Sequence, residues 1–127
     1  MDPKWNDDLP IYRQLRDRVV DMILEGVLSD GDVLPSVRNV AAEYRLNPLT
    51  VLKAYQELVD EGLVEKKRGR GMFVNDGAQD QLLKDERRRF IDKEWPLVRA
   101  TIERLGLDVT DLWQQQPSTT DAGADND

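Results

Sequence analysis

The chain of 127 residues contains no cysteine and no histidine. Without cysteine it has no disulfide, no thiolate metal site and no cysteine nucleophile. Without histidine it lacks the commonest general base and the commonest metal ligand. Carboxylates can also act as acids or bases, but here they fall in polar runs such as Asp7-Asp8 and Asp60-Glu61, which are typical of solvated faces and helix ends. The composition therefore argues against an enzyme and predicts neither a metal site nor a bound cofactor.

Long apolar runs are also missing, and no stretch approaches the length of about 20 residues that is needed to span a bilayer. The first nine residues are polar and acidic, which is unlike a secretory signal. The lack of cysteine fits a reducing compartment. We therefore expect a soluble, cytoplasmic protein with no membrane partner.

The charge is strongly acidic overall, with 18 Lys and Arg against 25 Asp and Glu, for a net charge of -7. Such a balance opposes binding to a polyanion, because phosphate contacts require basic side chains. The charges are, however, unevenly distributed along the chain. From Arg38 to Arg70 there are seven basic and five acidic residues, a local balance of +2, and four of the basic residues fall between Lys66 and Gly71. One basic face on an acidic body is compatible with DNA binding.

Three helices followed by a hairpin are predicted in the first 77 residues. Pro10 suits the start of a helix whose apolar residues recur at helical spacing. Ser36 is a favourable N-cap for a second helix, and the pair Asn47-Pro48 is a strong start signal for a third. Arg45 and Leu46 make the brief turn between them. The expected elements are helices over 10–25, 37–44 and 48–61, a very short strand at 33–34, and strands over 63–67 and 72–75.

Two helices joined by a tight turn form a helix-turn-helix, whose second helix fits the major groove of B-DNA. The early residues of that helix include Asn47, Leu49, Thr50 and Lys53. Asn can read adenine, Thr can contact a thymine methyl group or a phosphate, and Lys can reach guanine or a phosphate. The alternative is a plain three-helix core with an exposed polar helix.

The hairpin tip, Arg68-Gly69-Arg70-Gly71, strengthens the DNA-binding interpretation. Its glycines can take positive φ in a tight turn. A basic wing of this kind can follow a phosphate backbone or enter the minor groove, where Arg is favoured. Arg38, near the start of the second helix and opposite its apolar side, either contacts DNA or makes a surface salt bridge.

The remaining residues predict a helical tail. Apolar residues recur from Asp80 onward, Pro96 should kink or interrupt the helix, Gly106 should end it, and 109–113 can form one more short helix. The tail carries too many apolar residues for a helix lying alone in water, so it must pack on the first domain or on a second chain. We favour the second chain, because a twofold dimer matches a palindromic operator. Residues 114–127 are predicted to be disordered.

Residues 10–74 resemble the GntR family of bacterial regulators. The resemblance lies in the following stretches, in order: Pro10-Ile11-Tyr12-Arg13-Gln14, Gly26-Val27-Leu28, Gly31 to Arg38, Asn47 to Val51, Ala54 to Leu58, Gly62-Leu63, and Arg68 to Val74. It implies a winged helix-turn-helix that contacts operator DNA through the third helix, the arginine of the Leu-Pro-Ser-x-Arg motif, and the wing. The candidate contact residues are Arg38, Arg45, Asn47, Leu49, Thr50, Lys53, Arg68, Gly69 and Arg70.

Leu49 departs from the small polar residue that is more usual at its position in the subfamily that the chain resembles, and it either packs on a thymine methyl group or is tolerated there. The short tail resembles that of the YtrA-like subfamily, in which it serves mainly for dimerisation. Members of this subfamily often repress operons for transporters that include their own gene. The resemblance thus implies a mainly α fold, with DNA-binding residues 1–77, a dimerisation segment 78–113 and a disordered tail 114–127.

Two further points stay open on the sequence alone. A winged helix can also bind a protein, with its basic wing gripping an acidic partner, and salt-sensitive, sequence-selective binding to duplex DNA separates this hypothesis from the first. Regulation comes either from a small-molecule effector bound at the dimer interface or from no effector at all. Phe90, Trp95 and Trp113 serve either a small apolar pocket between the tail helices or the core.

Overall fold

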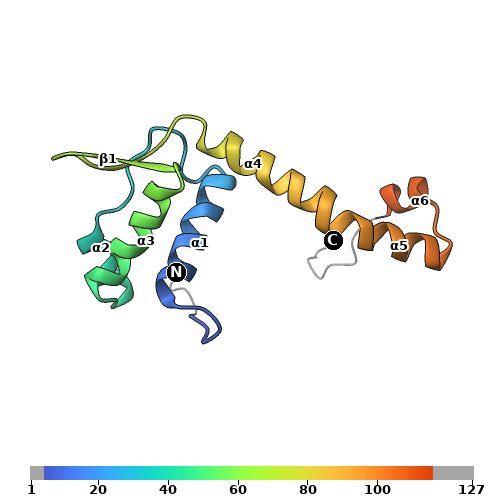
Figure 1. Cartoon of the computed structure of the whole chain (residues 1–127), viewed down its shortest axis with the longest axis horizontal. Helices are drawn as coiled ribbons and strands as arrows, with labels where there is room; N and C mark the ends of the chain where they lie inside the picture. Colours follow the sequence, from blue (N-terminus) through green and yellow to red (C-terminus); the bar gives the residue numbers. More distant parts are fainter. Residues whose placement is uncertain (1–4, 116–127) are drawn as a thin grey trace, which may run out of the picture. The chain divides into compact units, whose positions relative to one another are not determined.

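The computed structural model describes residues 5–115. In this range the chain is mainly helical with one antiparallel hairpin, as predicted (Figure 1). The chain divides into two compact units after Glu86, inside helix α4. The elements are α1 (Ile11–Leu24), α2 (Val37–Tyr44), α3 (Pro48–Asp60), β1 (Val64–Lys67), β2 (Gly71–Val74), α4 (Ala78–Arg89), the π-helical turn η1 (Phe90–Glu94), α5 (Trp95–Leu105) and α6 (Val109–Gln114).

The helix starts follow the predicted caps. The hydroxyl oxygen of Ser36 accepts a hydrogen bond from the Asn39 amide at 3.0 Å, and Asn47 Oδ1 accepts one from the Leu49 amide at 2.8 Å. Pro48 occupies the first turn of α3, where its missing amide costs nothing. The first helix, α1, starts one residue later than predicted. Pro10 has extended backbone angles and is the N-cap of the helix rather than its first residue.

The described part of the first unit, residues 5–86, is built around one apolar core formed by α1, α2, α3, the hairpin and the start of α4. Ile23, Val51 and Leu58 are fully buried at its centre. Ala78 and Leu82 of α4 are buried in the same core. This contact carries the first unit past Gly77, the end predicted from the sequence.

The wing is a two-stranded ribbon with an unambiguous register. Val64 pairs with Val74 and Lys67 pairs with Gly71, so three residues, Arg68 to Arg70, form the loop. Val64 and Val74 are buried and hold the base of the wing on the core. The short strand predicted at 33–34 is reduced to a single bridge between Val33 and Phe73.

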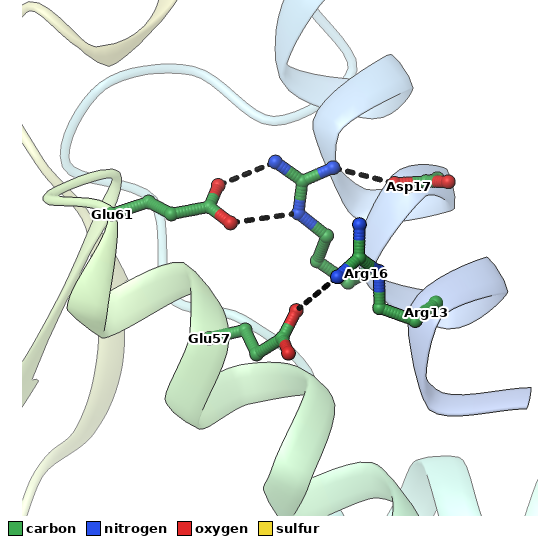
Figure 2. A network of polar contacts seen from close by, with 5 residues as sticks. All are labelled: Arg13, Arg16, Asp17, Glu57 and Glu61. Atoms are coloured by element: carbon green, nitrogen blue, oxygen red, sulfur yellow. Dashed lines mark hydrogen bonds and ion pairs between the residues drawn. The ribbon is translucent and has the colours of Figure 1, made fainter. Parts of the chain in front are cut away.

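Ion pairs fix α1 against α3. Figure 2 shows Arg16 of α1 reaching the Glu61 carboxylate with two nitrogens, while Arg13 lies 4.0 Å from Glu57. Arg16 also contacts Asp17 on its own helix. The hydrogen bond to Glu61 raises the pKa of the Arg16 guanidinium, which favours its charged form. These ion pairs help to hold α3 in its position against α1.

The second unit starts at Arg87 and differs sharply from the first in burial. None of its described residues, 87–115, is buried. The interruption expected from Pro96 is present, but it precedes the proline. The helix widens to π geometry over η1, and the Trp95 amide donates to the Phe90 carbonyl. Gly106 ends α5 in a left-handed conformation, and Asp108 caps α6.

The last helix, α6, extends one residue beyond the predicted Trp113, so Gln114 is helical rather than disordered. The rest of that prediction, for residues 116–127, lies outside the described residues. Among the described helices, none is both long and apolar enough to cross a membrane.

Candidate nucleic-acid interface

The turn between α2 and α3 is made by an arginine in an unusual backbone conformation. Arg45 ends α2 with φ 55° and ψ 49°, and within residues 5–115 it is the only residue other than glycine with positive φ. The Leu46 amide then donates to the Ala41 carbonyl at 2.9 Å, which closes the end of the helix. The side chain of Arg45 is exposed. This tight turn sets α3 directly after α2, as a helix-turn-helix requires.

The first turn of α3 carries three of the candidate contact residues. Asn47 and Leu49 are exposed, and Thr50 is half-buried. Asn47 uses its side-chain oxygen as the helix cap, so its Nδ2 group is the part that remains to donate to a base or phosphate. Leu49 is 70% exposed, which is exceptional for a leucine in this unit.

Lys53 is placed differently from the other candidates on α3. Its Nζ lies 4.1 Å from the centroid of the Tyr12 ring on α1, in a cation–π contact. One and two turns later, Glu57 and Glu61 face the arginines of α1. On the side of α3 that faces α1, successive turns thus carry charged residues that contact α1. Lys53 is the first of these residues along the chain.

Arg38 is exposed in the first turn of α2, where it borders an open hollow. The other residues lining this hollow belong to α2 and to the start of α3: Val37, Ala41, Ala42, Leu46 and Pro48. The guanidinium is therefore at the same surface as the first turn of α3. Sequence reasoning left a salt bridge open for Arg38, and within the described residues it has none.

The wing presents its basic residues around an aromatic ring. Phe73 on β2 lies under Lys67, whose Nζ is 4.6 Å from the ring centroid, and near Arg70, whose guanidinium carbon is 5.6 Å away. Arg68 is exposed at the tip. Gly69 and Gly71 take φ of +74° and +114°, so both fill positions that disfavour any side chain.

A groove of about 340 Å³ separates the wing from α2 and α3. Its walls mix apolar residues with the basic ones of the wing: Leu34, Pro35, Ser36, Val37, Leu52, Tyr55, Lys66, Lys67, Gly69, Arg70, Gly71 and Met72. Leu52 was not among the contact residues predicted from the sequence, although its outward position follows from the helix period. The residues buried around it, Val51 and Tyr55, leave Leu52 pointing outward.

Tyr55 forms part of the wall of this groove and ties α3 to the segment before α2. Its hydroxyl donates to the Pro35 carbonyl at 2.7 Å. Burial raises the pKa of Tyr55 to about 12, because a phenolate would lose its hydration there. The hydrogen bond holds the N-terminal end of α2, and with it Arg38, at a fixed distance from α3.

The interface therefore combines cations on three elements. Arg38, Arg45 and Arg68 are exposed, and each lacks an ion-pair partner anywhere in residues 5–115. Two carboxylates at the C-terminal end of α3, those of Glu57 and the C-cap Glu61, are engaged by arginines of α1. In the same part of the chain, no three acidic side chains are grouped to hold a metal ion. The arrangement suits an extended polyanion.

Comparison with known proteins agrees with this geometry. Residues 11–74 match the family described as bacterial regulatory proteins, gntR family. The chain is 40% identical over 108 residues to the HTH-type transcriptional repressor YtrA of Bacillus subtilis (strain 168), covering 85% of this chain and 75% of that protein.

Two solved structures extend the comparison to the fold. A GntR family transcriptional regulator from Listeria monocytogenes superposes with a TM-score of 0.66 at 26% identity, over 86% of this chain and 94% of that one. AraR(DBD) in complex with operator ORE1 superposes with a TM-score of 0.52 at 25% identity, over 58% of this chain and 92% of that one. The chain therefore belongs to the GntR family, as a YtrA-like, DNA-binding winged-helix regulator of transcription and not an enzyme.

Proposed function

We propose that this protein is a transcriptional repressor that binds a palindromic operator as a homodimer. In this proposal α3 enters the major groove, and the wing follows the adjacent phosphate backbone toward the minor groove. The base and phosphate contacts come from Arg38, Arg45, Asn47, Leu49, Thr50, Lys53, Arg68, Gly69 and Arg70. Acting on operator DNA, the protein would work in the cytoplasm.

The observation that carries the proposal is the set of exposed arginines without ion-pair partners. Arg38, Arg45 and Arg68 come from α2, the turn before α3 and the wing, which flank the helix that enters the major groove in this proposal. By contrast, Arg13 and Arg16 of α1 pair with carboxylates. A chain with net charge -7 that leaves these cations unpaired on one domain fits a phosphate-rich partner.

The direct test is fluorescence anisotropy with duplex DNA from upstream of the protein's own gene, in excess nonspecific competitor and over a salt series. We expect tight, competitor-resistant binding that weakens with salt. Arg38→Ala should lose about 1–3 kcal/mol of operator affinity if it contacts a base. Arg18→Ala, on α1 and outside both the candidate contact residues and the tail, is the matched control and should change affinity little. Equal affinity for operator and competitor DNA would instead favour a winged helix that grips an acidic protein.

Dimerisation through the tail is supported by its exposed apolar surface. In η1, α5 and α6, large apolar side chains face solvent: Phe90, Ile91, Leu97, Val98, Leu105, Val109 and Trp113. Trp113 is the most exposed of these side chains, at 90%. An isolated unit with this much apolar surface and no buried residue is unfavourable in water, and a second copy provides the cover.

The dimer is tested by ending the chain at Glu86. Every buried residue of the first unit lies before this point, so the shortened chain should stay folded. We expect sedimentation to give a dimer for the intact chain and a monomer for the short one. Operator affinity should fall about 100-fold or more, because the second half-site no longer binds intramolecularly. A monomeric intact chain would exclude the dimer.

The regulated genes follow from resemblance alone. We infer an operon for a transporter that includes the protein's own gene, in line with the YtrA-like subfamily. An effector, where one exists, would bind among the aromatic residues of the tail. Tight binding to the protein's own upstream region, and weak binding to unrelated promoters, is the result that this inference requires.

A further inference from the structure

The outward face of α3 carries two exposed leucines. Leu49 is 70% exposed and Leu52 is 40% exposed. They are three residues apart and therefore lie on adjacent turns of the same face. The apolar residues on the other side of α3, such as Val51 and Leu58, are fully buried. Leu49 and Leu52 thus form an apolar spot that the fold of this chain does not use.

Basic residues surround this spot. Leu52 lines the groove shared with Lys66, Lys67 and Arg70 of the wing. On the other side, Leu49 follows the turn that carries Arg45. An occupant must therefore be anionic around its edge and apolar at its centre. Duplex DNA matches both requirements, because phosphates flank the major groove and the thymine C5 methyl group is the apolar element on its floor.

We propose that Leu49 and Leu52 read thymine methyl groups, and that Leu52 is a specificity-determining residue of the operator complex. This inference rests on the proposed function. The first two turns of a recognition helix are the part that reaches base edges. Leucine offers no hydrogen bond, so its selectivity comes from the methyl group alone. Thymine is therefore preferred over cytosine, whose amino group would lose its hydration against a leucine without gaining a partner.

The expected effect follows from the burial of one methyl group. Removing one buried methyl contact should weaken binding about fourfold. Deoxyuridine differs from thymidine by this methyl group only and preserves the base pair. Exchange of thymidine for deoxyuridine therefore measures the contact without altering the hydrogen-bonding edge.

The test begins with selection of the full chain on a library of random-sequence duplexes. The enriched consensus is synthesised with each thymidine replaced in turn by deoxyuridine, and affinity is measured by anisotropy. We expect about a fourfold loss at one or more thymidines in each half-site. With Leu52→Ala, the loss at the thymidine that Leu52 contacts should shrink below about twofold. At that position, 5-methylcytosine should be tolerated better than cytosine.

Val27→Ala is the matched control, because Val27 is 61% exposed in the loop after α1 and outside the interface. It should leave every deoxyuridine effect unchanged. A consensus that binds tightly but shows no deoxyuridine effect, or the same effect in Leu52→Ala, would overturn the inference and leave the proposed function standing. Failure to enrich any sequence would refute the proposed function, and this inference with it.

Discussion

Replacing Arg45 by glycine should make the protein more stable and a weaker DNA binder at once. Arg45 has φ 55° and ψ 49°, a conformation that costs a residue with a side chain about 1–2 kcal/mol. Glycine avoids this cost but loses about 0.4–1 kcal/mol through the greater freedom of the unfolded chain. The net expectation is a gain of about 0.5–1 kcal/mol, or about 4 °C in the melting temperature of a unit of this size.

The loss of binding is measured by the salt dependence. If Arg45 contacts one phosphate in each half-site, its removal makes the slope of log affinity against log salt shallower by about 2 for the dimer. Thermal melts by far-UV circular dichroism, at one protein concentration, give the stability. Operator anisotropy at several salt concentrations gives the slope.

Arg45→Lys is the control, because it keeps both the charge and the side-chain penalty. Its stability should equal that of the wild type, and its slope of log affinity against log salt should be close to the wild-type slope. A glycine variant that melts at or below the wild-type temperature would refute the argument from backbone conformation. A glycine variant with an unchanged salt slope would remove Arg45 from the phosphate contacts.

Three further predictions concern the scaffold of the interface. Tyr55→Phe should cost about 1 kcal/mol at neutral pH for the lost hydrogen bond. Burial raises the pKa of Tyr55 from 10.0 to about 12, so the stability that neutral Tyr55 contributes should be present below pH 10 and be lost as pH rises toward 12. Urea midpoints of the phenylalanine variant should therefore fall less than those of the wild type between pH 10 and 12. Arg16→Gln should lower the free energy of unfolding by about 1 kcal/mol, because it removes the ion pair that joins α1 to the end of α3. Arg99→Gln, which breaks an exposed ion pair within one helix, should lower it by under about 0.5 kcal/mol. Equal losses would contradict the role of Arg16 in holding the two helices together. Phe73→Leu should weaken operator binding about threefold with little change in melting temperature, by removing the ring that holds the wing cations, and unchanged affinity would show that the ring does not position them.

Much of the first unit was accessible from the sequence because its local signals agree with its packing. Ser36 and Asn47-Pro48 predicted the starts of α2 and α3, and both side chains cap as expected. The glycines of the wing predicted the hairpin, although Gly71 proved to be the first residue of β2 rather than part of the loop. These features depend on residues within a few positions of one another, where helix period and turn chemistry act directly.

Long-range contacts were not accessible in the same way. Nothing local indicates that Lys53 lies over Tyr12, some forty positions earlier, because the contact depends on how α1 crosses α3. The extension of the first unit into α4 has the same cause, since Ala78 and Leu82 are buried by residues of other elements. The π-helical turn before Pro96 was predicted only as an interruption, because the proline excludes a regular helix without dictating which irregular one replaces it.

The three tryptophans of this chain give it built-in optical probes. Trp5 lies edge-on to Tyr44, with ring centroids 6.3 Å apart, and so reports on the end of α2. Trp95 lies beside Phe90 in the second unit, and Trp113 is almost fully exposed there. Variants that retain a single tryptophan would therefore emit from one unit at a time. In the variant that keeps Trp113, the emission should shift to the blue as a second chain covers that ring. In the variant that keeps Trp5, the emission should follow the folding of the DNA-binding unit.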